Sequence, residues 1–138
     1  WHLLGLIAHQ DRQFEQAIDH YRRVLALQSH HHDIYNNLGV VFQEQGHLTE
    51  AIAHYEKSLA LKPDYPDAHN NYANALREQG HLDRAIDHYR RAVELRPDYA
   101  DAHNNLGLAL FAQGEFEQAA AAYQQALVCR PDYPQAHN

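Results

Sequence analysis

The chain contains no methionine and only one cysteine, Cys129, among its 138 residues. A single cysteine excludes an internal disulfide, and with it a small disulfide-stabilised fold. The scarcity of cysteine also favours a reducing compartment, so we expect a cytoplasmic location. Because methionine is absent and the sequence starts at Trp1, we expect it to be a segment of a longer protein.

Positive charge is scarce as well. The chain has 11 Lys and Arg against 18 Asp and Glu, which gives a formal net charge of −7 with neutral histidines. Nucleic acids and anionic membranes attract basic surfaces, so we expect neither as a partner. No apolar run approaches the roughly 20 residues of a membrane span, and no secretory signal pattern is present. Apolar residues still make up 45% of the chain, which is enough for a folded core.

Motifs of catalysis are missing too. The sequence has no phosphate-binding glycine loop, no nucleophilic serine elbow and no cysteine–histidine pair with a third partner. Its 13 histidines invite a metal interpretation, and the tract SHHHD at 29–33 could capture a metal ion adventitiously. The spacing of that tract matches no structural zinc pattern. We therefore expect no enzyme activity, no cofactor and no specific metal site.

What the sequence does contain is a repeat with a period of 34 residues. Shifting the chain against itself by this period aligns alanines, tyrosines and prolines. The aligned sets are Ala17, Ala51, Ala85 and Ala119; Tyr21, Tyr55, Tyr89 and Tyr123; and Pro63, Pro97 and Pro131. The predicted units are 1–31, shortened at its start, then 32–65, 66–99 and 100–133, with a further unit beginning at 134–138.

Each unit is predicted to be a pair of helices. Apolar residues recur at helical spacing in 33–46, and Gly46 ends this first helix because glycine adopts the left-handed conformation at no steric cost. The second helix covers 48–61, and Pro63 stops it. Its buried stripe is predicted to be Ala51, Ile52, Tyr55, Leu59 and Leu61.

Small residues are expected where the two helices of a unit cross closely. The first helices carry Gly39, Ala73 and Gly107 at this position, where a larger side chain would force the pair apart. Unit one departs from the pattern, because Arg12 stands where the other units have glycine and Ser29 where they have proline. We expect a less regular turn in this unit and a looser junction after it.

The recurring histidines have a simpler explanation than metal binding. His69, His103 and His137 fall at one repeat position. Neighbouring helices are about 8–10 Å apart, which is too far for easy sharing of an ion whose bonds to nitrogen are about 2.1 Å long. These histidines are therefore predicted to be packing residues.

The whole pattern resembles the tetratricopeptide repeat. The segment YNNLGVVFQEQGHLTEAIAHYEKSLALKP at 35–63 is close to the family consensus. Its residues at the signature positions are Tyr35, Leu38, Gly39, Phe42, Ala51, Tyr55 and Pro63. The resemblance covers essentially the whole chain and implies one domain over 1–138 with an all-α fold, a right-handed α-solenoid of stacked helix-turn-helix units. In that fold the first helices line a concave groove and the second helices form the outer wall.

Opposite their packing stripes, the first helices carry the residues that this fold would place in the groove. The candidates for peptide binding are Asn37, Val40 and Gln43 in the second unit, Asn71, Asn74 and Arg77 in the third, and Asn105, Leu108 and Phe111 in the fourth. An Asn amide both donates and accepts hydrogen bonds, so it can hold the backbone of an extended peptide whatever its side chains are.

Two rows of asparagine run through these helices. The row Asn37, Asn71 and Asn105 resembles the asparagine ladder of O-linked N-acetylglucosamine transferase repeat domains, which implies binding of peptide backbone. The neighbouring row is Asn36, Asn70 and Asn104. Because asparagine near a helix start often bonds locally, the second row is predicted to serve local structure.

We therefore predict a protein-interaction scaffold that binds an extended peptide or a partner protein in its groove. Two alternatives stay open: the substrate-recruiting region of a larger enzyme such as a glycosyltransferase, and a self-assembly module. Self-association would use the uncapped ends, Trp1, Leu4 and Ile7 on one side and Ala121, Leu127 and Val128 on the other. Arg77 is the one basic groove residue of the complete units, beside Asp33, Asp67 and Asp101, so an acidic peptide tail is expected to be a poor ligand.

Overall fold

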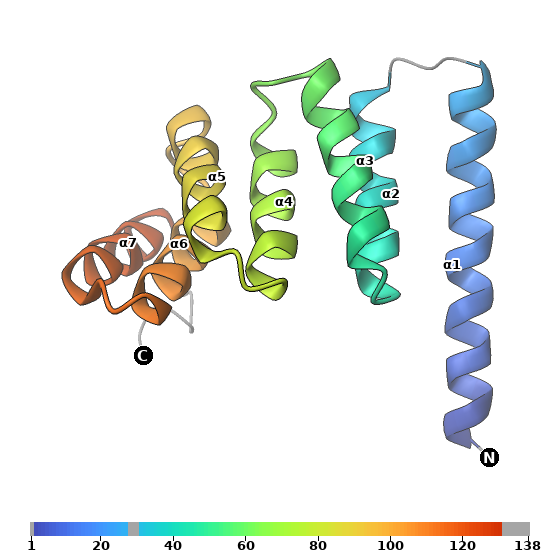
Figure 1. Cartoon of the computed structure of the whole chain (residues 1–138), viewed down its shortest axis with the longest axis horizontal. Helices are drawn as coiled ribbons and strands as arrows, with labels where there is room; N and C mark the ends of the chain where they lie inside the picture. Colours follow the sequence, from blue (N-terminus) through green and yellow to red (C-terminus); the bar gives the residue numbers. More distant parts are fainter. Residues whose placement is uncertain (1, 28–30, 131–138) are drawn as a thin grey trace. The chain divides into compact units, whose positions relative to one another are not determined.

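The chain divides into two compact parts, each larger than a single repeat. From here on, unit 1 is Trp1–Pro63 and unit 2 is Asp64–Asn138. The computed structural model describes residues 2–27 and 31–130. Within these ranges the chain is α-helical, with short turns and no strand (Figure 1). This agrees with the all-α class expected from the repeat.

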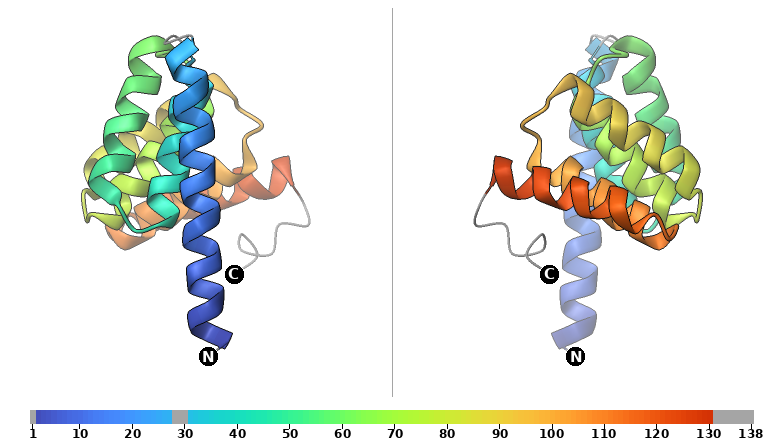
Figure 2. Two further views of the ribbon diagram at one scale, coloured as in Figure 1. Left: turned by 90° about the vertical axis from the view of Figure 1, so that its right-hand side faces the viewer. Right: turned by 90° about the vertical axis from the view of Figure 1, so that its left-hand side faces the viewer.

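Unit 1 contains α1 (His2–Leu27), α2 (His32–Glu44) and α3 (Leu48–Leu61). The expected turn inside the first repeat is absent, because α1 is one uninterrupted helix of 26 residues (Figure 2). Arg12 explains this difference. The other repeats end their first helix at a glycine with positive φ, and an L-residue resists that conformation, so nothing terminates the helix here.

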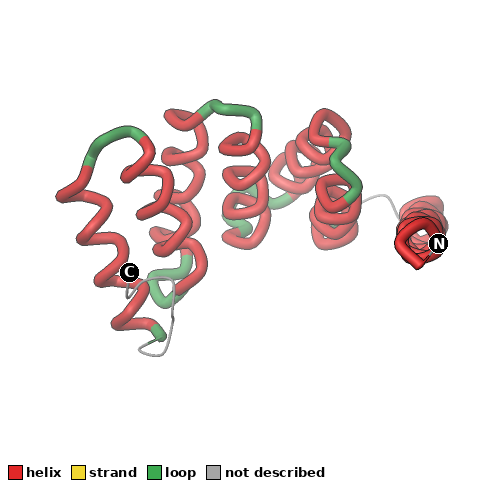
Figure 3. Tube along the Cα trace, turned by 90° about the horizontal axis from the view of Figure 1, so that it is seen from below, coloured by secondary structure: helices red, strands yellow, loops and turns green. Residues whose placement is uncertain are grey.

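Unit 2 contains α4 (Pro66–Glu78), α5 (Leu82–Leu95), α6 (Ala100–Ala112) and α7 (Phe116–Cys129). Short loops join α4 to α5 and α6 to α7, so that the unit consists of two helical hairpins (Figure 3). The hairpins pack on each other through α5 and α6, and α4 also contacts α6. Pro66 is the first residue of α4, where its missing N–H does no harm because the first turn of a helix makes no bond with it.

The turn inside each hairpin is built on the predicted glycine. Gly46, Gly80 and Gly114 have φ values of +84°, +89° and +85°. In the first of these turns the N–H of Gly46 bonds to the carbonyl of Gln43 at 2.9 Å, and the N–H of His47 bonds to that of Phe42 at 2.8 Å. This is the Schellman arrangement, which satisfies carbonyls at the helix end. The other two turns repeat it.

The core lies where the helices of each hairpin cross. Tyr55 and Tyr89 have no exposed surface, and Ala51 and Ala85 are likewise fully buried. Gly39 lies under the ring of Tyr55, and Gly107 lies under that of Tyr123. The prediction that small residues permit a close crossing is therefore confirmed.

The predicted stripe on α3 is correct except at its last member. Ala51 and Tyr55 are buried, and Ile52 and Leu59 are half-buried. Leu61, however, is 40% exposed. With 3.6 residues per turn, Leu61 points about 200° around the helix from Leu59, so both cannot face the core.

Two of the recurring histidines pack as predicted. His69 and His103 are each 8% exposed. The Nδ1 atom of His69 lies 3.0 Å from Nδ1 of His88, while Nε2 of His103 bonds to the carbonyl of Pro97 at 2.8 Å. His137 lies outside the described residues.

Candidate peptide-binding face

The predicted binding residues lie on the first helix of each hairpin. In unit 1, α2 carries Asn37, Val40 and Gln43, all half-buried. In unit 2, the half-buried residues of the set are Asn71, Asn74 and Arg77 on α4 and Asn105 on α6. The row of asparagines across repeats two to four stays a prediction, because its first member belongs to a different unit from the other two.

Leu108 and Phe111 on α6 are the most exposed members of the set. Their exposed fractions are 43% and 58%. The ring of Phe111 meets that of Phe116 edge-on, with the centroids 5.0 Å apart, and Phe116 is itself 60% exposed. The start of α7 therefore extends the apolar surface of α6.

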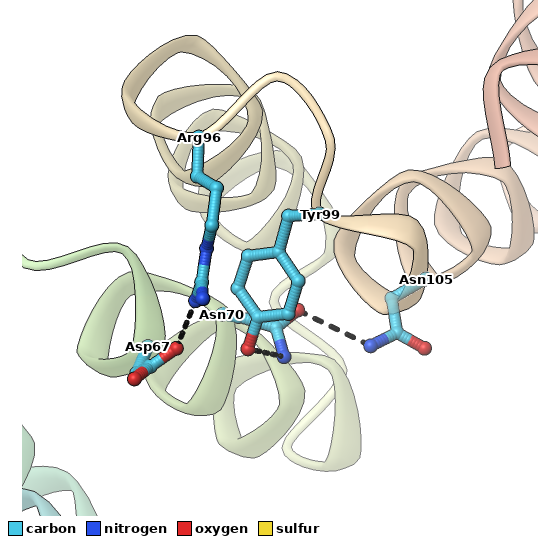
Figure 4. A network of polar contacts seen from close by, with 5 residues as sticks. All are labelled: Asp67, Asn70, Arg96, Tyr99 and Asn105. Atoms are coloured by element: carbon cyan, nitrogen blue, oxygen red, sulfur yellow. Dashed lines mark hydrogen bonds and ion pairs between the residues drawn. The ribbon is translucent and has the colours of Figure 1, made fainter. Parts of the chain in front are cut away.

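Asn105 is tied to the preceding hairpin by a chain of polar contacts (Figure 4). Its amide nitrogen donates to the side-chain oxygen of Asn70 at 3.2 Å, and the amide nitrogen of Asn70 donates to the hydroxyl of Tyr99 at 3.3 Å. The guanidinium of Arg96 lies 4.0 Å from the centroid of the Tyr99 ring and forms an ion pair with Asp67. This network joins α4, the loop after α5, and α6.

For Asn70, the network corrects the prediction made for the second asparagine row. Asn36, Asn70 and Asn104 are buried, with exposed fractions of 5%, 5% and 0%. The printed bonds of Asn70 are not local, however, since they reach Tyr99 and Asn105 in the next hairpin, and no side-chain hydrogen bond caps α4. Asn70 therefore holds neighbouring hairpins together.

Burial raises the pKa of Tyr99 to about 12, and the nearby carboxylate of Asp67 adds to the rise. The hydroxyl therefore stays protonated at neutral pH, so that it can donate a hydrogen bond while it accepts one from Asn70. Tyr99 was not among the sequence candidates. Its signal was the recurring PDY, at 63–65, 97–99 and 131–133, of which the sequence analysis used only the prolines.

In repeats two and three, the tyrosine of the second helix reaches across its hairpin to a predicted binding residue. Tyr55 donates to the side-chain oxygen of Gln43 at 2.7 Å. Tyr89 donates to the side-chain oxygen of Asn74. Burial raises the pKa of Tyr89 to about 12, so its hydroxyl remains a donor. These bonds fix the orientation of Gln43 and Asn74, a constraint that the repeat pattern alone did not reveal.

The fourth repeat lacks such an acceptor. Leu108 and Phe111 occupy the positions of Asn74 and Arg77, and within the described part of the chain the hydroxyl of Tyr123 makes no hydrogen bond. Burial raises the pKa of Tyr123, while the positive charge of Arg77 opposes that rise. Arg77 therefore exerts its field on the tyrosine of the following hairpin.

Two of the three aspartates that argued against an acidic ligand have cationic partners. Asp67 pairs with Arg96, and Asp101 lies 3.5 Å from Arg130. The pairs are about half exposed, so each contributes little to stability. They nevertheless reduce the negative charge at the starts of α4 and α6.

A shallow cleft of unit 2 lies away from the predicted residues. It is lined by Asp83, Ile86, Asp87, Arg90, Leu110, Gln113, Glu115 and Gln118. Arg90 donates to Gln118 at 2.9 Å, and Gln113 donates to Asp83, so the opposite walls are bonded to each other. This cleft is a seam between the two hairpins.

Two further features are absent from the described residues, a cluster of metal-ligating side chains and a helix that could span a membrane. Among them, no group of three or more His, Cys, Asp or Glu side chains could hold a metal ion. Residues 28–30, which include part of the histidine tract, lie outside the described part. No helix in residues 2–27 or 31–130 combines the length and the hydropathy of a membrane span.

Helical hairpins of equal length, each with a glycine turn and a tyrosine packed at its crossing, define a helical repeat protein. Models described as the tetratricopeptide repeat match residues 1–64, 42–87 and 100–133, and one described as a TPR repeat matches 73–114. The chain belongs to the tetratricopeptide repeat family. No curated protein matches it significantly.

Solved structures share its fold. The crystal structure of MamA is 27% identical over 94% of this chain and 75% of its own, with a TM-score of 0.83. The first TPR of Spaghetti (RPAP3), bound to the HSP90 peptide SRMEEVD, is 28% identical over 78% of this chain and 85% of its own, with a TM-score of 0.76. YrrB, at 22% identity and a TM-score of 0.79 over 96% of this chain and 69% of its own, supports the fold alone. Together they confirm the helical solenoid class.

Proposed function

We propose that this chain is a protein-interaction scaffold and that the α4–α6 face of unit 2 binds an extended peptide. The α4–α6 face comprises Asn71, Asn74 and Arg77 of α4 and Asn105, Leu108 and Phe111 of α6. The observation that carries the proposal is the exposure of Leu108 and Phe111 beside half-buried amides at equivalent repeat positions. The 28% identical first TPR of RPAP3 is a repeat domain seen with a peptide, which supports this class of function.

The two kinds of side chain on this face have different tasks. Amides bind peptide backbone, and exposed apolar rings and methyl groups bury apolar side chains of the ligand. Each hydrogen bond adds only about 0.5–1.5 kcal/mol net. Three asparagines with one bond each would supply about 1.5–4.5 kcal/mol, whereas a micromolar complex requires about 8 kcal/mol. Leu108 and Phe111 must therefore contribute to any useful affinity.

Asn105 has fewer groups available for binding a peptide than the sequence suggested. One of its amide hydrogens bonds to Asn70. Its second amide hydrogen and its side-chain oxygen are the groups left for a ligand. The same bond holds the side chain in place, so less conformational entropy is lost when a peptide binds.

The test is binding of short fluorescent peptides to the wild-type chain and to the Asn71→Ala, Asn105→Ala double variant. We expect the double variant to bind roughly tenfold more weakly, as the loss of two hydrogen bonds predicts. The control is Gln124→Ala, Gln125→Ala, which removes two exposed amides from α7. Circular dichroism confirms that each variant stays helical. Equal binding by all three proteins would refute the proposal.

A further inference from the structure

Two polar side chains of α4 are oriented by the same tyrosine. Tyr89 donates its hydroxyl hydrogen to the side-chain oxygen of Asn74. Its ring lies beside the guanidinium of Arg77, 5.9 Å from centroid to Cζ. Because the oxygen of Asn74 is already engaged, the hydrogens of its amide group are the atoms left for a further partner.

Part of the guanidinium group of Arg77 has no hydrogen-bond acceptor among the described residues. Its Nη1 atom is buried and has no hydrogen-bond partner in the described part of the chain. Nor does Arg77 form an ion pair with any described carboxylate. The Arg77 side chain is half-buried, and the fork of a guanidinium fits a carboxylate in particular. Asn74 and Arg77 are three residues apart on α4, so their side chains are neighbours on the helix surface.

The neighbouring hairpin offers a different chemistry at the same repeat positions. Leu108 and Phe111 stand there, 43% and 58% exposed. The two hairpins are adjacent, because α4 contacts α6 and Asn105 bonds to Asn70. The field of Arg77 reaches Tyr123 of this second hairpin. A pair of hydrogen-bond donors on α4 therefore lies next to an apolar pair on α6.

We propose that Asn74 and Arg77 bind the side-chain carboxylate of an Asp or Glu in an extended peptide, whose next apolar residue packs on Leu108 and Phe111. This inference rests on the proposed function and names the ligand class. The carboxylate belongs to a side chain within the peptide, because the peptide has to continue from α4 to reach α6. Asp67 and Asp101 oppose such a ligand only weakly, since Arg96 and Arg130 neutralise them.

The experiment measures fluorescence anisotropy with short peptides that are acetylated and amidated at their ends. Four peptides carry Asp-Ser-Leu, Asn-Ser-Leu, Asp-Ser-Ser or Asn-Ser-Ser in one neutral polar background, because side chains two residues apart point to the same side of an extended peptide. For the wild-type chain we expect the change from Asp to Asn, and the change from Leu to Ser, each to weaken binding about tenfold. For Arg77→Gln we expect the preference for Asp over Asn to vanish while the preference for Leu persists.

Two further variants separate the parts of the site. Phe111→Ser should lose the preference for Leu over Ser and keep the preference for Asp over Asn. Arg91→Gln removes an equal charge from α5, where Arg91 pairs with Glu94 at 3.4 Å, and should keep both preferences. Helix content by circular dichroism shows that each variant is folded.

The outcomes separate this inference from the function on which it rests. If the wild-type chain binds the Asp and Asn peptides equally, the carboxylate site is wrong and the scaffold proposal stands. Full retention of the Asp preference by Arg77→Gln also overturns the site. An Asn-Ser-Leu peptide with a free C-terminus that binds as tightly as the capped Asp-Ser-Leu peptide would assign the carboxylate to the chain end, against the inference. If no peptide binds, both proposals fail.

Discussion

Gly39 lies against the ring of Tyr55, so that a Cβ atom at residue 39 would stand 2.6 Å from Cδ1 of the ring. Real carbon atoms do not approach so closely, and Tyr55 is fully buried. The ring is also held by its bond to Gln43. The close crossing of α2 and α3 therefore depends on the missing side chain.

The first prediction concerns Gly39→Ala. In an ordinary helix this change would stabilise by about 0.5–1 kcal/mol. Here we expect a net loss of about 1–3 kcal/mol, because the buried ring has no space into which it can move. Urea unfolding followed by circular dichroism measures the difference.

Gly107→Ala is the matched control. A Cβ atom there would stand 2.6 Å from Cε1 of Tyr123, but Tyr123 is only half-buried and its hydroxyl has no bond in the described part of the chain. Its ring can shift, so the loss should be clearly smaller. In repeat three, Ala73 already occupies this position. A Gly39→Ala variant as stable as the wild type would contradict the account of the crossing.

The second prediction compares Tyr55, whose hydroxyl has an acceptor, with Tyr123, whose hydroxyl has none in the described part of the chain. Tyr55→Phe removes a 2.7 Å hydrogen bond to Gln43 and leaves the side-chain oxygen of Gln43 with one partner fewer. We expect a loss of about 0.5–1.5 kcal/mol. Tyr123→Phe should change the free energy of unfolding by much less, because Leu108 and Phe111 offer its hydroxyl no acceptor. Equal losses in the two variants, measured by urea unfolding, would argue against a role for the bond.

A third prediction concerns the histidine pair of the α4–α5 hairpin. Burial lowers the pKa of His88 below 6.5, the charges of His69 and Arg84 lower it further, and Asp87 acts in the opposite direction. The ring of Tyr72 stacks on that of His88, with the centroids 4.5 Å apart. The unfolded chain therefore binds a proton more readily than the folded chain does. The stabilisation is complete above pH 6.5 and is lost as the pH falls through the lowered pKa of His88.

His88→Ala tests this dependence. Repeat four, which contains His103, already has an alanine, Ala122, at the position equivalent to His88. We expect the wild-type chain to lose more stability than the variant when the pH falls from about 7 to about 5. His81→Ala removes an exposed histidine and should leave the dependence unchanged. The measurement is the urea midpoint at each pH, and identical slopes for the wild type and His88→Ala would contradict the prediction.

Much of the fold follows from local signals. The predicted second helix, 48–61, coincides with α3 (Leu48–Leu61), and the glycine turns lie where expected. These features depend on residues close together in sequence, namely a glycine that permits positive φ and a proline that lacks an N–H. The same logic failed at Arg12 because a missing stop signal lets the helix continue, which periodicity alone does not reveal.

The candidate site was only partly predictable. The period placed Asn105, Leu108 and Phe111 on one helix, but it did not show that Asn105 bonds to Asn70 or that Tyr89 holds Asn74. Such bonds depend on distances between helices about 15–35 residues apart in sequence. The sequence therefore predicted which residues share a position, and the structure showed how each one is oriented.

The last prediction concerns self-association through α7. Val128 is 74% exposed and Ala121 is exposed, while Leu127 is half-buried, so these residues are partly uncovered as the sequence analysis expected. Apolar surface of this kind favours contact with another copy of the chain. Sedimentation equilibrium at increasing concentration should show reversible association. Val128→Glu should shift the chain toward monomer, because burying a carboxylate is unfavourable.

Gln79→Glu adds the same charge at the exposed end of α4 and should have little effect, which separates a local apolar contact from repulsion by net charge. A wild-type chain that stays strictly monomeric at high concentration would show that the exposed end of α7 is not a self-association surface.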